Sequence, residues 1–162
     1  MPLDGPEFRQ VMRRWATGVS VVTTGGGGDR HGITVNSFSS LSLDPPLCLI
    51  CIDKRSKAHA AIPATGSYTV NLLASGQEDI SSRFAGRRPD LADLFEGLAL
   101  VAAPSGNPVL QGCLGYLDCS LYASLPGGDH TIFIGRVEHA AALEDRPPLL
   151  FFGGAYRSLA ER

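Results

Sequence analysis

Short runs of β-branched and aliphatic residues, separated by glycine and proline turns, recur along this chain of 162 residues. Ser20 to Thr24, Leu47 to Ile52 and Tyr68 to Leu73 each have the composition and length of a strand. Most intervals between such runs are turns, not the crossover helices that parallel pairing requires. The pattern therefore predicts a mainly β fold, an antiparallel barrel with a few peripheral α-helices.

The composition is that of one ordinary globular domain, covering residues 1–162 with a core over about 8–157, because no linker or internal repeat divides it. A formal net charge of -2 provides no basic footprint, so we expect no nucleic acid partner. No apolar run reaches membrane-spanning length, and the first residues lack the apolar segment of a signal peptide. We therefore expect a cytoplasmic protein with no membrane partner.

Cys48 and Cys51 have the C-x-x-C spacing of many redox and zinc sites. They lie within the apolar run 47–52, and residues three apart on a strand point to opposite faces. Such a pair suits neither one ligand set nor one disulfide, so the four cysteines are expected to be reduced core residues. No other cluster has metal-ligand spacing, and no metal site is expected.

Three stretches predict helices. Apolar residues from Phe8 to Trp15 follow an i, i+3, i+4, i+7 spacing, which predicts a core-facing helical stripe that ends near Gly18. Ser56 can cap a short helix over 57–62, before Pro63. The Ser-x-x-Glu box at 75–78 predicts a helix over 76–85.

The segment 32–46 predicts a strand that breaks into a hydroxyl-rich loop before a proline pair. A strand end that becomes irregular frees backbone N–H groups, and short hydroxyl side chains add donors. Such a loop suits a polar ligand with several acceptors, such as a flavin ring edge or a phosphate; the alternative is a Ser/Thr-rich turn without a ligand. Its polar residues are Thr34, Asn36, Ser37, Ser39, Ser40 and Ser42.

Basic residues follow the strand 47–52 directly. Lys54, Arg55 and Lys57 flank the expected helix cap Ser56. Cations and unpaired N–H groups at a helix start favour a phosphate, although a solvated basic turn has the same composition.

Two further positions are candidates for a small-molecule site. Phe84 is either a core residue or flanks a ring system. His130 follows the turn 126–129 at the start of a long strand, at an expected barrel rim, where an imidazole could orient an amide or a phosphate. No Gly-x-Ser-x-Gly motif and no nucleophile–base–acid arrangement is present, so an enzyme built this way takes its chemistry from a cofactor.

Taken together, these segments resemble the flavin reductase-like family, the short-chain NAD(P)H:flavin oxidoreductases that serve two-component monooxygenases. The resemblance covers about 8–157, nearly the whole chain, and 32–46 is its most specific piece. The matching pieces occur in the family's order, at 8–24, 32–46, 83–86, 128–137 and 148–157.

The resemblance implies an antiparallel six-stranded FMN-binding split barrel, normally a homodimer. It implies that one loop holds the flavin ring and ribityl chain, that the basic run holds the flavin phosphate, and that two further residues line the flavin. The flavin-binding residues are then Thr34, Val35, Asn36, Ser37, Ser39, Ser40, Asp53, Lys54, Arg55, Ser56, Phe84 and Ala85. Those on the nicotinamide side are His130, Tyr156 and Arg157, with His130 positioning the nucleotide.

The reaction implied is hydride transfer from nicotinamide C4 of NADH or NADPH to N5 of free FMN or FAD, with the protein supplying proximity and orientation. The reduced flavin would then reach a partner flavin-dependent monooxygenase. Two alternatives share the fold: a carrier that keeps FMN tightly bound, and a split-barrel oxidase that acts on a small substrate. The polar loops at the expected strand ends count against a barrel used only for protein interaction.

Overall fold

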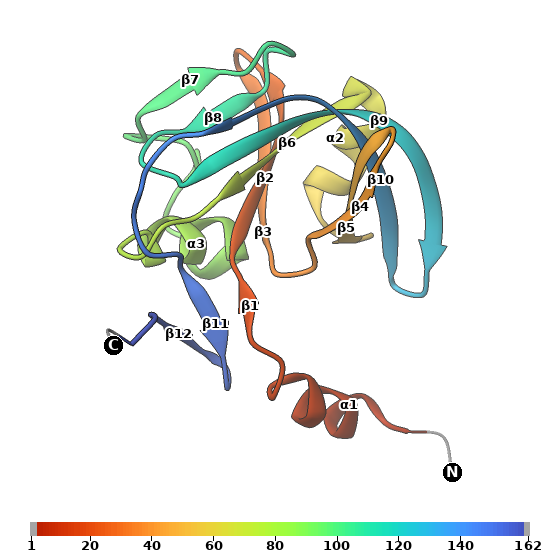
Figure 1. The fold of residues 1–162 in the computed structure, drawn as a ribbon, viewed down its shortest axis with the longest axis vertical. Helices are drawn as coiled ribbons and strands as arrows, with labels where there is room; N and C mark the ends of the chain where they lie inside the picture. Colours follow the sequence, from red (N-terminus) through yellow and green to blue (C-terminus); the bar gives the residue numbers. More distant parts are fainter. Residues whose placement is uncertain (1–2, 161–162) are drawn as a thin grey trace.

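The computed structural model describes residues 3–160 and is dominated by one curled antiparallel sheet (Figure 1). Its seven strands follow the order β3-β2-β6-β9-β10-β5-β4, and every pairing is antiparallel. The mainly β, antiparallel fold expected from the sequence is therefore confirmed. The strands are β2 (Ser20–Gly26), β3 (Asp29–Val35), β4 (Ser39–Leu43), β5 (Pro46–Asp53), β6 (Ser67–Leu72), β9 (Gly115–Gly127) and β10 (His130–Ala142).

The two edge strands of this sheet, β3 and β4, follow each other in the chain but do not pair, which leaves the barrel split. Ser37, in the short connection between them, fastens this gap to β5: its hydroxyl donates to the Cys51 carbonyl at 2.9 Å and accepts from the Cys51 N–H at 3.2 Å. The expected loop is shorter than predicted, because Ser39 to Leu43 pairs with β5 and forms a seventh strand where six were expected.

The barrel interior is filled by alternate residues of its strands. On β5, Cys48, Ile50 and Ile52 are buried, whereas Cys51 lies on the other face and is partly exposed. The opposite orientation predicted for Cys48 and Cys51 is therefore confirmed. The interior cluster also contains Tyr68 and Phe133.

Smaller elements flank the barrel. Strands β1 (Thr17–Gly18), β11 (Leu150–Phe152) and β12 (Ala155–Arg157) form a three-stranded sheet, and β7 (Leu100–Ala102) pairs with β8 (Pro108–Leu110). The helix α3 (Glu78–Ser82) continues into a π-helical turn, η1 (Arg83–Arg87). Beneath them lies a second buried cluster that contains Phe84, Phe95 and Leu110.

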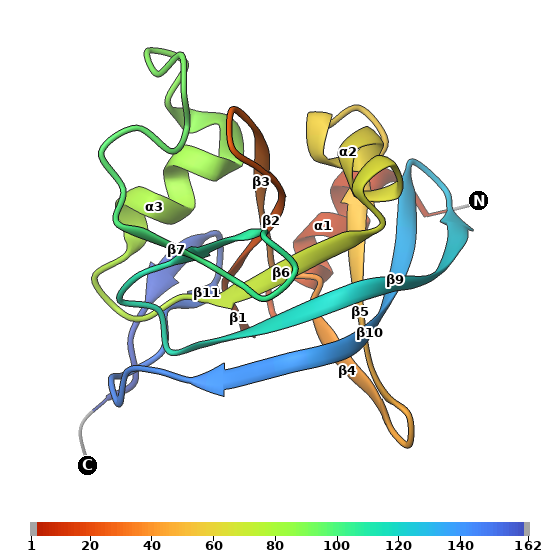
Figure 2. The same ribbon diagram turned by 90° about the horizontal axis from the view of Figure 1, so that it is seen from above.

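The helix α2 (Lys57–Thr65) is longer than predicted and contains Pro63 instead of ending before it. Ala58 and Ile62 are buried against the sheet, and Gly66 ends the helix with φ of 70°. Seen from above, α2 and α3 lie on the same side of the sheet with β3 between them (Figure 2). This arrangement places the start of α2 and the turn η1 on either side of β3.

The helix α1 (Gly5–Met12) corrects one prediction, because its apolar stripe does not face the core of its own chain. It contains no buried residue, and it stands apart from the sheet in Figure 1. Phe8 is 54% exposed, Val11 65% and Trp15 67%. The spacing predicted an apolar face correctly, but it carries no information about what covers that face. No helix within residues 3–160 is long and apolar enough to cross a membrane.

Candidate functional site

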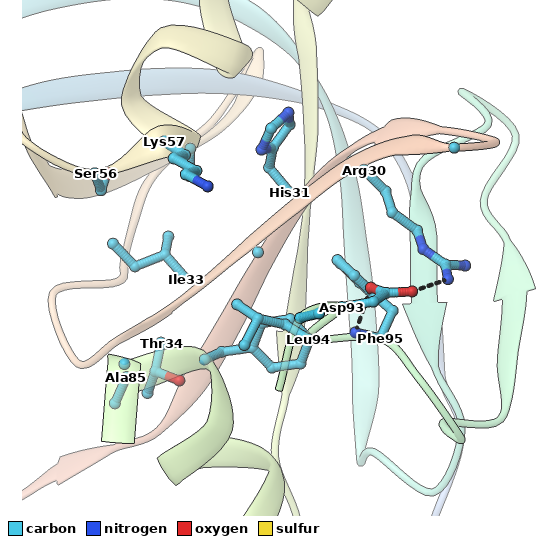
Figure 3. Close-up of a pocket in the computed structure, with 16 residues that line it drawn as sticks. Arg30, His31, Ile33, Thr34, Ser56, Lys57, Ala85, Asp93, Leu94 and Phe95 are labelled. Atoms are coloured by element: carbon cyan, nitrogen blue, oxygen red, sulfur yellow. Dashed lines mark hydrogen bonds and ion pairs between the residues drawn. The ribbon is translucent and has the colours of Figure 1, made fainter. Parts of the chain in front are cut away.

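A cavity of about 740 Å³ opens where β3, the start of α2, the turn η1 and the segment 92–95 meet (Figure 3). A second cavity of about 170 Å³ lies towards β11 and β12. Both cavities are lined by Thr34 and Ala85, so they adjoin at the end of β3. An elongated ligand can therefore extend from one into the other past the strand end that the sequence singled out.

The start of α2 forms one wall of the larger cavity. The Ser56 hydroxyl accepts from the His59 N–H at 3.2 Å and donates to the Asp53 carbonyl at 2.9 Å, which fixes the first turn. The first-turn N–H groups of Lys57 and Ala58 have no acceptor within the helix, and both residues line the cavity. Two such amides, the positive end of the helix and the Lys57 ammonium suit a phosphate.

The loop after β3 offers backbone donors instead of the hydroxyl donors expected from the sequence. The Thr34 hydroxyl donates to the Ser81 carbonyl at 2.7 Å, and the Ser37 hydroxyl is used by Cys51. The backbone N–H groups of residues 36–38, in contrast, find no acceptor within residues 3–160. The hydroxyls therefore shape the loop, and its amides are available to a ligand with acceptor atoms along one edge.

Phe84 is both a core residue and a wall of the larger cavity, which joins the two interpretations made from the sequence. Its side chain is only 3% exposed and meets Phe95 edge to face, with ring centroids 4.9 Å apart. Gly32 permits this contact, since a Cβ atom there would lie 2.5 Å from Phe84 Cε1. The strand backbone and the aromatic ring thus approach closely at the cavity floor.

The predicted basic run divides into two parts. Arg55 forms an ion pair with Asp53, with Nη2 and Oδ2 2.7 Å apart, and this hydrogen bond holds the pKa of the Asp53 carboxyl far below its usual range. Lys54 Nζ donates to the Gly128 carbonyl at 2.6 Å. Of this run only Ser56 and Lys57 line the larger cavity, while Lys54 secures the end of β5 to the β9–β10 turn and Arg55 pairs with Asp53.

Of the three residues assigned to the nicotinamide side, one lines a cavity and two do not. Tyr156 lines the smaller cavity and donates its hydroxyl proton to Ser81 Oγ at 2.8 Å. His130 lies opposite Asp53 in the β10–β5 register, and its Nδ1 is 2.7 Å from Asp129 Oδ1, an interaction that lowers the pKa of Asp129. His130 and Arg157 line neither cavity.

The remaining flavin assignments fall into three groups. Thr34, Phe84 and Ala85 line the larger cavity; Val35 and Asn36 line the smaller one. Ser37, Ser39 and Ser40 line neither, and Ser39 and Ser40 belong to the edge strand β4.

Several lining residues were not found from the sequence. Arg87 lines the smaller cavity, and its position one residue after the Arg-Phe-Ala-Gly run was the available signal. Arg30, Asp93 and Phe95 line the larger cavity. Arg30 follows a glycine-rich run that predicts only a hairpin connection, and no motif marks the segment 88–98.

A split antiparallel barrel with loop amides, a helix start and an aromatic wall around adjoining cavities defines a protein that holds a flat, phosphate-bearing ligand. The comparisons identify the family. The family described as "Flavin reductase like domain" matches residues 12–160, and the chain belongs to it.

Similar proteins match nearly all of this chain and most of their own length. The reductase subunit of a flavin-dependent monooxygenase from Rhodococcus jostii is 40% identical over 157 residues, which cover 97% of this chain and 79% of that protein. The reductase component of the 4-hydroxyphenylacetate 3-monooxygenase of Thermus thermophilus is 40% identical over 152 residues, covering 94% and 95%. The solved NADH:FAD oxidoreductase of Streptomyces globisporus superposes with a TM-score of 0.91 at 39% identity, covering 99% and 96%.

Proposed function

We propose that this chain is an NADH-dependent flavin reductase, which reduces free FMN or FAD and supplies the reduced flavin to a partner monooxygenase. Membership of the family and relatives named as reductase components of monooxygenases support this proposal. The observation that carries it is the pair of adjoining cavities, with Thr34 to Asn36, around the end of β3, at one place and the start of α2 at another.

The residues of the cavities fit a flavin. The amides of Lys57 and Ala58, with the Lys57 ammonium, would hold the phosphate, and the Asn36 amide, at the smaller cavity, would donate to an acceptor atom on the ring edge. Phe84 and Ala85 would line the ring. Bound flavin supplies the hydride acceptor, which no side chain provides.

The protein's own contribution is to bind and orient. Amides fixed by the Thr34 and Ser37 hydroxyls are pre-organised donors and need no reorganisation when negative charge develops near them. Arg87, in the smaller cavity, adds a cation there. His130, together with Tyr156 and Arg157, is proposed to position the pyridine nucleotide at the mouth of the site.

The test is oxidation of NADH and of NADPH by the purified chain with FMN, FAD and riboflavin in turn. Turnover with NADH and a free flavin is expected, and no turnover with any pair would overturn the proposal. The electron-carrier alternative makes a different prediction: the protein would stay yellow through dialysis and fail to reduce added flavin.

We also propose that the chain is a homodimer in the cytoplasm. The uncovered apolar residues of α1 and of the turn after it support a second copy, since exposed Phe8, Val11 and Trp15 close together in the chain are typical of an interface. Four free cysteines, three of them buried, are typical of a reducing compartment. Light scattering on a sizing column checks the mass, and a monomer at micromolar concentration would contradict the dimer.

A further inference from the structure

The larger cavity does not end at the start of α2. On the far side of His31 it is closed by three residues that the proposed flavin contacts do not use: Arg30, Asp93 and Phe95 (Figure 3). The Arg30 guanidinium lies over the Phe95 ring, 4.9 Å from its centroid, and its Nη2 is 2.9 Å from Asp93 Oδ2. The other carboxylate oxygen, Asp93 Oδ1, accepts from the Phe95 N–H at 2.9 Å. This wall is therefore held in one arrangement before any ligand binds.

The chemistry of this wall suits a purine base. One face of the planar Arg30 side chain covers Phe95, and a guanidinium that lines a cavity can stack a base on its other face. A carboxylate has more acceptor sites than the two bonds that Asp93 makes, and the exocyclic amine of adenine is a donor. Together they offer stacking and a hydrogen bond to an adenine.

The charges between this wall and α2 suit the phosphates of a dinucleotide. The Lys57 ammonium and the Arg30 guanidinium line the cavity, against one carboxylate, that of Asp93, and the His31 imidazole between them lies with its Nε2 3.0 Å from Asp29 Oδ1. Figure 3 shows Ser56 and Lys57 on one side of His31 and Arg30 on the other. A ligand whose phosphate sits at the start of α2 thus has a positively charged path to the wall.

We propose that Arg30, Asp93 and Phe95 form a subsite for the adenosine end of a dinucleotide, so that the chain binds FAD in preference to FMN. This rests on the proposed function and extends it to the choice of flavin. Two dinucleotides of the reaction carry an adenosine, FAD and NADH. FAD fits the cavity directly, because the flavin phosphate proposed at α2 lies in the same cavity as the wall.

A structural role for the same residues makes a different prediction. If the Arg30–Asp93 pair only attached the segment 88–98 to β3, its loss would lower stability and affect all ligands alike. Ligand-resolved affinities therefore separate the two roles.

The experiment measures Kd for FAD and FMN by quenching of flavin fluorescence, and for AMP, NADH and reduced nicotinamide mononucleotide by calorimetry. The variant is Arg30→Gln, which keeps a polar, hydrogen-bonding side chain but removes the charged guanidinium plane. Arg88→Gln is the matched control, because Arg88 also pairs with carboxylates, Asp79 and Asp90, yet lines neither cavity. Asp93→Asn is the second variant, and thermal unfolding confirms that each variant folds.

Wild-type protein should bind FAD about tenfold more tightly than FMN, and Arg30→Gln should weaken FAD about tenfold while FMN changes less than about twofold. AMP should compete with FAD in the wild type but not in the variant. A loss confined to NADH, with reduced nicotinamide mononucleotide unchanged, would overturn the FAD preference and place the adenosine of NADH at this wall instead.

Equal Kd values for FAD and FMN in the wild type, with NADH unaffected by Arg30→Gln, would overturn the subsite and leave the flavin site standing. Equal weakening of FAD and FMN in the variant would also overturn it. Failure of the wild type to bind either flavin would instead overturn the proposed function.

Discussion

The helices α1 and α2 have similar lengths but opposite relations to the sheet. α2 buries Ala58 and Ile62, and its first turn is a wall of the larger cavity. α1 buries nothing, although its apolar stripe is the more regular of the two in the sequence. A periodic apolar face therefore predicts a helix. What packs on that face depends on the tertiary or quaternary structure.

The largest effect that tests this contrast is expected for Ile62→Ala. Ile62 is fully buried beneath α2, so the truncation leaves a cavity and should lower the free energy of unfolding by about 2–5 kcal/mol at any protein concentration. Urea unfolding followed by circular dichroism measures it. A loss that disappeared at high protein concentration would mean that α2, like α1, depends on a second copy.

Next in size is the effect on assembly of the double variant Val11→Asp, Trp15→Ser. Charge and lost apolar area on α1 should weaken the dimer by at least about 2 kcal/mol while each protomer keeps its fold. Sedimentation velocity across a concentration series gives the dissociation constant. Ala60→Asp, on the exposed side of α2, is the control; an unchanged dimer in the double variant would remove α1 from the interface.

Lys57→Gln examines the ligand side of α2. Loss of the ammonium should raise the Kd of FMN about tenfold, because a charge-assisted contact to phosphate is lost, and should leave riboflavin, which has no phosphate, unchanged. Fluorescence quenching measures both values at two salt concentrations. Equal weakening of FMN and riboflavin would place the phosphate elsewhere.

His130→Ala is expected to act on the nucleotide alone. His130 lies outside both cavities but next to the β5 end that precedes α2, so we expect the KM for NADH to rise about fivefold with little change in that for flavin. Steady-state kinetics with each substrate varied in turn gives the two constants. An equal rise in both would contradict a positioning role confined to NADH.

The smallest effect concerns the pH dependence of the wall opposite α2. The Phe95 N–H and then Arg30 hold the pKa of Asp93 below its usual range. The stability that the ionised Asp93 contributes is therefore present above the unfolded pKa of about 3.9, and it is lost as pH falls through the lower pKa of the folded state. Asp93→Asn should therefore melt at most about 2 °C lower at pH 7, since the Arg30–Asp93 pair is partly exposed, and this difference should shrink as pH falls through the folded pKa of Asp93. Calorimetry from pH 7 into acid measures both melting temperatures. A difference between variant and wild type that widens in acid would contradict the prediction.

The sequence predicted the antiparallel barrel because its strands alternate and its turns are marked by glycine and proline. It also located the end of β3 and the start of α2. Ser56 marks the start of α2 because its hydroxyl caps the helix by accepting from the N–H of His59, three residues away, and Ser37 marks the point where β3 has ended. It could not find Arg30, Asp93 and Phe95 as one group. Asp93 lies 63 residues from its partner, and the segment 88–98 reaches β3 through contacts distant in sequence, such as Phe95 on Phe84 and Asp93 with Arg30.

The loop from Asn36 to Phe38 presents main-chain amides, and its serine hydroxyl proton is already used inside the protein. Every amino acid except proline carries such an amide, so the donors survive most substitutions of the side chains that bear them. What must persist is the shape, set by a hydroxyl at position 37 bridging to Cys51. Selection on this loop therefore acts on backbone course more than on side-chain identity, which leaves the outward-facing Asn36 available for adaptation to new ligands without loss of the amides beside it.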